Sequence, residues 1–183
     1  MTSLQIRKLT YSAMFLAIAI VLPYLTGAIP EIGKRLCPMH IPVLLCGFLC
    51  GWPWGLAVGF IAPLLRSPLG MPVFYPDAVV MAFELAAYGA AAGLAWRLLP
   101  RKKWSVYAAL LIAMLIGRIV YGLVYLVLSG LGFVNATVTW VFFVERAFIK
   151  PLPGIIAQIV LIPVLVLILD RAGLSLNRPK EEA

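Results

Sequence analysis

Residues 41–65 read IPVLLCGFLCGWPWGLAVGFIAPLL, an uncharged apolar stretch that is interrupted at Gly51-Trp52-Pro53-Trp54-Gly55. Proline disrupts a continuing helix and glycine weakens one. We therefore expect a hairpin of two short helices, residues 41–51 and 53–65. Crossing a bilayer takes roughly 20 apolar residues, so at least one of the two must be tilted or only partly inserted. Backbone at that depth is tolerated where surrounding protein shields it.

The composition of the whole chain agrees with a membrane location. Of its 183 residues, 63% are hydrophobic and only 12% are charged, and the mean hydropathy is +1.03. A soluble domain does not carry this much apolar surface. We expect residues 1–183 to form a single transmembrane domain, with no room for a separate soluble one.

Four longer apolar segments flank the hairpin and complete an all-α bundle of six transmembrane helices. They are expected at about residues 6–26, 77–98, 105–128 and 148–169. Asp77 follows Pro76 and is a candidate N-cap. Arg7 and Lys8 before the first segment resemble the start of a signal peptide, but the apolar character of the rest of the chain favours a retained helix.

The distribution of basic residues predicts the orientation. The net charge of +8 indicates topology rather than nucleic-acid binding, because the cations flank apolar segments. With the N-terminus inside, nine of the fifteen Lys and Arg residues are cytoplasmic: Arg7, Lys8, Arg97, Arg101, Lys102, Lys103, Arg171, Arg178 and Lys180. Five face outward: Lys34, Arg35, Arg66, Arg146 and Lys150. Both termini are therefore expected in the cytoplasm.

Two ionisable residues, Glu84 and Arg118, fall inside predicted spans. A charge in the hydrocarbon region costs a few kcal/mol, so it normally faces a partner or a cavity. Glu84 and Arg118 can serve only as a buried ion pair, or they can take part in binding a ligand. The sequence leaves both interpretations open.

Further polar and aromatic residues fall at the same level of the bundle and could line an outward-facing cup. Arg118, Tyr121 and Tyr125 share one helical face. The candidate ligand-binding residues are His40, Arg66, Tyr75, Glu84, Tyr88, Arg118, Tyr121, Tyr125, Asn135, Trp140, Lys150 and Gln158. Any one of them alone also fits a structural role, since interfacial aromatics and snorkelling cations are common.

The motifs of enzymes are missing from the sequence. We find no metal-binding cluster, no Ser/His/Asp set and no phosphate-binding loop, so no cofactor is expected. Cys37, Cys46 and Cys50 lack metal-site spacing and are expected to be packing residues. Gly47, Gly51, Gly55 and Gly59 recur every four residues, as do Gly89 and Gly93 and the pair Ala13 and Ala17. Such small-residue faces allow close helix contact, and we expect the glycines to pack inside the bundle.

Taken together, these features resemble the substrate-binding (S) component of an energy-coupling factor (ECF) vitamin transporter, in its pantothenate and hydroxymethylpyrimidine branch. The resemblance covers residues 5–172. The residues that carry it are the Ala13/Ala17 pair, the Met39–Gly51 stretch with Gly55 and Gly59, the Ser67–Pro72 loop, Glu84 with Tyr88-Gly89, Gly117-Arg118 and Pro153-Gly154.

The resemblance implies a six-helix protein that captures a water-soluble vitamin in an outward-facing cup closed by the loops after the first, third and fifth helices. It implies that Ala13 and Ala17 contact a transmembrane coupling subunit, and that two separate ATPase subunits supply the energy. Pantothenate is the first candidate ligand because the candidate cations outnumber the carboxylates. Hydroxymethylpyrimidine, a pyridoxine-like ring or another B vitamin is the alternative, bound by aromatic stacking.

Two other functions remain open at this point. A non-transporting membrane scaffold predicts a dry bundle with Glu84 and Arg118 paired, whereas a transporter subunit predicts an outward cavity of a few hundred Å³. A self-sufficient secondary transporter usually shows an internal repeat and midplane carboxylates. We find neither an obvious repeat nor a second midplane carboxylate in the sequence.

Overall fold

The computed structural model describes residues 2–26, 37–70, 72–100, 102–133 and 140–177. These residues form α-helices and three short helical segments, and no strand occurs among them. The helices are α1 (Ser3–Thr26), α3 (His40–Cys50), α4 (Trp52–Arg66), α5 (Val79–Leu98), α6 (Lys103–Gly130), α7 (Trp140–Val144) and α8 (Leu152–Arg171). The short segments are η1 (Ser67–Leu69), η2 (Phe74–Ala78) and η3 (Glu145–Ile149). The described part of the chain is thus all-helical, as predicted.

The hairpin of α3 and α4 turns at Gly51. This residue has φ +102°, a backbone conformation that favours glycine, and its N–H donates to the Gly47 carbonyl. The two helices have 11 and 15 residues. Both are therefore shorter than an ordinary span.

Two helices begin later than expected. Residues 74–78 form η2, so α5 begins at Val79, and no side chain caps its N-terminus. The prediction of Asp77 as the N-cap is wrong, because Asp77 is inside η2 and its carboxylate faces Arg146 at 3.8 Å. The last helix begins at Leu152 rather than at residue 148, since Pro151 has no N–H for a continuous helix and 145–149 form η3.

Four segments are long and apolar enough to cross a membrane by length and composition. They are Ser3–Tyr24, Phe74–Leu98, Trp104–Gly130 and Leu152–Arg171 among the described residues. The six-span count and the cytoplasmic position of both termini stay predictions.

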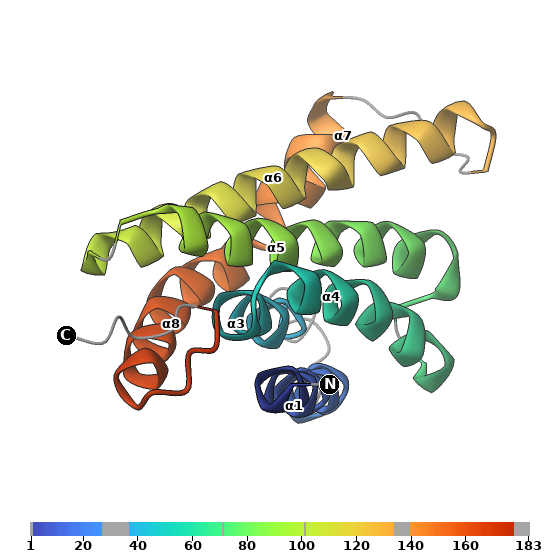
Figure 1. Ribbon diagram of the computed structural model, residues 1–183. Coiled ribbons are helices and arrows are strands. Elements are labelled where there is room, and N and C mark those ends of the chain that lie inside the picture. The colour runs from blue at the N-terminus through green and yellow to red at the C-terminus, as the bar shows by residue number, and fades with distance from the viewer. Residues whose placement is uncertain (1, 27–36, 71, 101, 134–139, 178–183) are drawn as a thin grey trace.

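Helix α5 occupies the centre of the bundle (Figure 1). It lies between α6 on one side and α3 with α4 on the other, while α1 packs against α3 and α4. Helix α8 contacts α3 and α6. The residues that α5 directs toward both neighbours are therefore enclosed by protein.

The glycines allow this close packing. A Cβ atom at Gly89 would overlap the Gly55 carbonyl of α4, and one at Gly59 would overlap the Leu85 carbonyl of α5. Gly47 likewise faces the backbone of Gly89. The prediction that the glycine stripes are internal contacts is confirmed.

Helix α1 packs against α3 and α4 through one face. Ser12, Phe15 and Ala19 are buried, and the Ser12 hydroxyl lies 3.5 Å from the Cys46 thiol of α3. Cys46 and Cys50 are buried and form no disulfide, which agrees with a packing role. Ala13 and Ala17 point elsewhere and are exposed.

The segment after α8 folds back over the hairpin. The Leu176 N–H donates to the Leu49 carbonyl at 2.8 Å, and the Asn177 Nδ2 donates to the Gly93 carbonyl at 2.9 Å. The first bond ties the segment after α8 to the end of α3, and the second ties it to α5, at the end of the bundle opposite η2.

We predict that Gly89→Ala lowers the apparent Tm of the purified protein in detergent. The added methyl group must displace the backbone of α4, and such overpacking costs roughly 1–3 kcal/mol. Gly130→Ala is the matched control, because no atom lies within 4 Å of a Cβ placed there. Equal Tm values for Gly89→Ala and wild type would show that the α4 and α5 backbones are not in contact at Gly89.

Candidate functional site

An ion pair between α5 and α6 lies at the centre of the candidate site. Arg118 Nη1 donates to Glu84 Oε1 at 2.7 Å. The two residues are 7% and 2% exposed, so neither charge is solvated. A buried pair of this kind is held by mutual attraction that must offset the desolvation of both groups.

His40 and Tyr88 complete the surroundings of this pair. His40 is the first residue of α3, and its Nε2 lies 3.8 Å from Glu84 Oε1. Its ring meets the Tyr88 ring edge-on, with 5.2 Å between centroids. The Arg118 guanidinium carbon lies 5.9 Å from the centre of the Tyr88 ring. We refer to His40, Glu84, Tyr88 and Arg118 as the buried cluster.

The local sequence explains how these side chains meet. Glu84 and Tyr88 are four residues apart and therefore share one face of α5. Gly117 precedes Arg118, and a Cβ atom there would come within 2.7 Å of the Tyr88 ring. Glycine at this position lets the tyrosine ring lie directly on the backbone of α6.

Several polar atoms of the buried cluster lack a hydrogen-bond partner among the described residues. They are both ring nitrogens of His40, the hydroxyl of Tyr88 and the Nε of Arg118. The Nε2 of Gln158 also lacks a hydrogen-bond partner among the described residues. Gln158 is in α8 and is 1% exposed. Leaving a buried polar group without a partner costs about 1–3 kcal/mol, and native proteins keep few of them. Most of these groups are hydrogen-bond donors, so the cluster is suited to a molecule that offers acceptor oxygens or nitrogens.

A second charged pair lies at the end of the bundle formed by η2 and η3. Arg146 Nη1 lies 3.8 Å from Asp77 Oδ1, and the two side chains are 36% and 45% exposed. The same Nη1 lies 3.2 Å from the hydroxyl of Tyr125. The Tyr121 and Tyr125 rings adjoin each other with centroids 5.9 Å apart. We refer to Asp77 and Arg146 as the rim pair.

Other predicted ligand residues are engaged elsewhere. Arg66 Nη1 donates to the Ile20 carbonyl of α1 at 2.7 Å, and its guanidinium stacks on Tyr24. Tyr75 packs edge-on against Phe133. Lys150 pairs with Glu145 at 3.1 Å. The structure thus brings none of these three to the buried cluster.

Two of the predicted residues are described incompletely or not at all. Asn135 lies outside the described residues, as does most of the first predicted outer connection at 27–36. Trp140 is the first residue of α7.

Cys37 is a neighbour of the buried cluster that the sequence reasoning assigned only to packing. It precedes α3, close enough to Arg118 and Glu84 for both charges to act on the thiol. Burial raises the pKa of the Cys37 thiol to about 11, so the thiol is protonated at neutral pH. The spacing of Cys37 from the other cysteines does not indicate that it lies beside Glu84 and Arg118.

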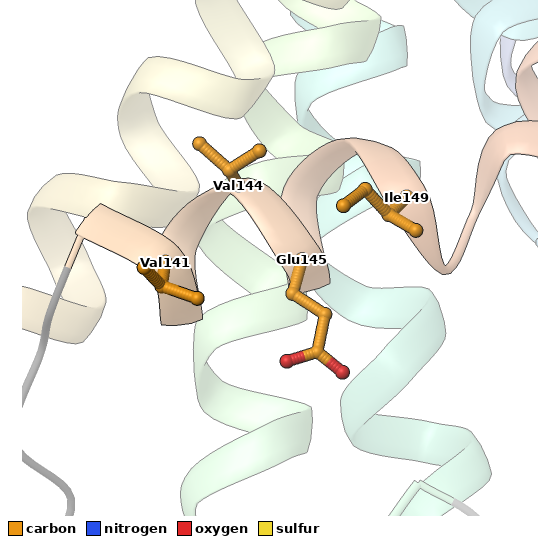
Figure 2. Close-up of a pocket in the computed structure, with 4 residues that line it drawn as sticks. All are labelled: Val141, Val144, Glu145 and Ile149. Carbon is orange, nitrogen blue, oxygen red and sulfur yellow. The ribbon is translucent and has the colours of Figure 1, made fainter.

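A hollow of about 500 Å³ lies beside α7 and η3 (Figure 2). It is lined by Val141, Val144, Glu145 and Ile149. Val141 and Ile149 are 73% and 62% exposed, so the hollow is an open apolar surface. Among the residues that the structure describes, no predicted ligand residue lines it, so its described lining differs from the polar cup expected from the sequence.

Comparison with known proteins identifies the family. The family described as "ECF transporter, substrate-specific component" matches residues 7–166, most of the 183-residue chain. No curated protein and no solved structure matched the chain in the comparisons. The matched region includes every residue of the buried cluster and of the rim pair. The chain therefore belongs to the family of substrate-specific components of ECF transporters.

Proposed function

We propose that this protein binds a small water-soluble vitamin or vitamin precursor at the buried cluster and delivers it to an ECF transport complex. Its family implies a multi-pass membrane protein that binds a substrate and works with coupling and ATPase modules, rather than an enzyme. The identity of the substrate and the residues that hold it are our proposal.

The observation that carries the proposal is the set of buried donors around Glu84. The Arg118 guanidinium donates to Glu84 through Nη1. Among the described residues, neither its Nε nor the hydroxyl of Tyr88 beside it has a hydrogen-bond partner. A molecule with acceptor groups would satisfy them in a low-dielectric environment, where a charge-assisted hydrogen bond is strong. A scaffold would gain nothing from these unmatched groups.

Pantothenate remains the first candidate ligand. It carries a carboxylate, hydroxyl groups and an amide, which together can accept from Arg118, His40 and Tyr88. A hydroxymethylpyrimidine or a pyridoxine-like ring is the alternative. That ligand would use the edge and face of His40 and Tyr88 for ring contacts and Glu84 as an acceptor.

One observation favours the alternative function of a membrane scaffold. Glu84 and Arg118 are bonded to each other, as that reading predicts, and the hollow beside α7 is not at the cluster. Two observations argue against a scaffold: the chain belongs to a family of substrate-specific transporter components, and buried donors beside the pair lack hydrogen-bond partners among the described residues.

The proposal includes the orientation and the partners. Both termini lie in the cytoplasm of a prokaryote, the end of the bundle with η2 and η3 faces outward, and two ATPase subunits act through a coupling subunit. Ala13 and Ala17 are exposed on α1. Their small side chains leave a flat surface on which a helix of the coupling subunit can pack closely.

We predict that mass spectrometry of the purified wild-type protein detects one bound vitamin-like molecule, and that Arg118→Ala weakens its binding at least tenfold. Loss of a buried charge-assisted contact is worth more than about 1.4 kcal/mol. Binding is measured by titrating the identified molecule into protein from which it has been removed.

Arg97→Ala is the control, since it removes the same side chain from the exposed last turn of α5. The apparent Tm of each variant shows whether it is folded. Recovery of lipid alone from an active preparation would support the scaffold, and unchanged affinity in Arg118→Ala would exclude Arg118 from the site.

We also predict that replacing Ala13 and Ala17 together with Leu abolishes uptake but leaves binding unchanged. The larger side chains would hold the coupling helix away from α1, far from the buried cluster. Uptake is measured in cells that co-express the coupling and ATPase subunits, with Ala172→Leu, another exposed alanine, as the control. Loss of binding in the double variant would assign these alanines to the fold instead.

A further inference from the structure

A second group of polar side chains lies between α1 and α3. Cys46 and Cys50 are four residues apart on α3 and therefore share one of its faces. Both are fully buried. The Cys46 thiol donates to the Ser12 hydroxyl of α1 at 3.5 Å. Ser12 is also hydrogen-bonded to Cys50, and the two thiols interact with each other. We refer to Ser12, Cys46 and Cys50 as the thiol cluster.

Lys8 adds a positive charge beside the thiol cluster. It precedes Ser12 by four residues and so lies on the same face of α1. Its charge acts on the Cys50 thiol, and its own side chain is partly exposed. Helix α1 lies at the edge of the bundle (Figure 1) and is held by a narrow buried strip that includes Phe15 and Ala19. The seam between α1 and α3 therefore reaches the surface beside Lys8, which provides an entry path for an ion.

The number of ligands limits which ion the thiol cluster can hold. A structural zinc site takes four ligands, and the part of the chain that the structure describes has no group of three or more His, Cys, Asp or Glu side chains that could hold a metal. Cu(I) prefers soft thiolate ligands and is commonly held by two of them in a line. The spacing that excludes a zinc site therefore does not exclude Cu(I).

The spacing of the two cysteines suits such a linear arrangement. A metal–thiolate bond is about 2.3 Å long, so an ion midway between two sulfurs needs them roughly 4.6 Å apart. Residues four apart on a helix have Cβ atoms about 5–6 Å apart. Cys46 and Cys50 can therefore reach this sulfur separation through their side chains alone, with α3 unchanged.

We propose that Cys46 and Cys50 form a binding site for a soft monovalent metal ion, Cu(I), between α1 and α3. The thiolate is the form that binds a metal, so both thiols lose their protons, each sulfur forms one bond to the ion, and the ion stays in the +1 state. The complex has one net negative charge. Lys8 neutralises this charge, as a buried ion requires, and the Ser12 hydroxyl donates to a sulfur.

This site is separate from the proposed ligand site. Cys50 follows His40 by ten residues, which is about 15 Å along α3. The remaining cysteine, Cys37, lies beside the buried cluster, and the chain has three cysteines in all. Cys37→Ala therefore leaves the thiol cluster as the one source of thiols, and it is the reference protein for the test.

We predict that the Cys37→Ala protein takes one Cu(I) per chain from the coloured complex of Cu(I) with bicinchoninate. The titration is done in detergent with ascorbate present and oxygen excluded. Adding Cys46→Ala or Cys50→Ala should lower the affinity by about a hundredfold or more, because the second ligand on the same helix acts at a high effective concentration. The apparent Tm of each variant shows whether it is folded, and Ser replaces Ala where it is not.

Lys8→Gln in the reference protein should weaken Cu(I) binding by about two- to fivefold, because it removes a partly exposed charge from beside the complex. Arg7→Gln is the matched control, since it removes the same charge from the neighbouring exposed position. Equal affinity after loss of either cysteine would overturn the proposal and assign the ion to methionine thioethers. A folded reference protein that takes no Cu(I) would overturn it as well. The assay uses no vitamin, so either result leaves the proposed function unchanged.

Discussion

A carboxylate and a guanidinium that are removed from water together impose the central constraint on this protein. Glu84 and Arg118 meet at 2.7 Å between α5 and α6 and are almost fully buried. Removing one partner of such a pair typically costs 3–5 kcal/mol, whereas replacing both with neutral groups can leave stability unchanged. Because stability alone does not require such a pair, its presence points to a function. Here its neighbours, His40 and Tyr88, carry polar atoms that the described protein groups do not satisfy.

The packing of the bundle holds that pair in place. Glycines on α3, α4 and α5 bring the three backbones into contact, so α5 cannot rotate Glu84 away from α6 without overlap on its other side. The same close approach sets His40, at the start of α3, against Glu84 and Tyr88. The residues after α8 bond to α3 and α5 at the far end. The end of the bundle with η2 and η3 has instead the weak rim pair, and this difference is consistent with binding at one end and a fixed structure at the other.

Much of the helical organisation could be predicted from the sequence, because apolar runs bounded by charges and prolines are clear signals in a membrane protein. Residue spacing also predicted the break at Gly51 and Pro53 and the packing of the internal glycines. It likewise indicated that Arg118, Tyr121 and Tyr125 share one face of their helix. The directions of Arg66 and Lys150 could not be predicted. Each lies at a helix end, where a long side chain reaches several partners, and Arg66 bonds to a carbonyl of α1 that no spacing indicates. Glu84 could be recognised as exceptional, but α5 is apolar on all sides, so periodicity did not show which neighbour it faces.

We propose that the Glu84–Arg118 pair is kept for binding rather than for folding. The double variant Glu84→Gln/Arg118→Met tests it most directly, because it removes both charges and leaves no single buried charge behind. Its apparent Tm and the small molecules that it retains are measured on the same preparation. We expect the double variant to fold, with an apparent Tm close to that of the wild type, and to retain no vitamin-like molecule. A folded double variant that still retains the wild-type amount of the same molecule would contradict it.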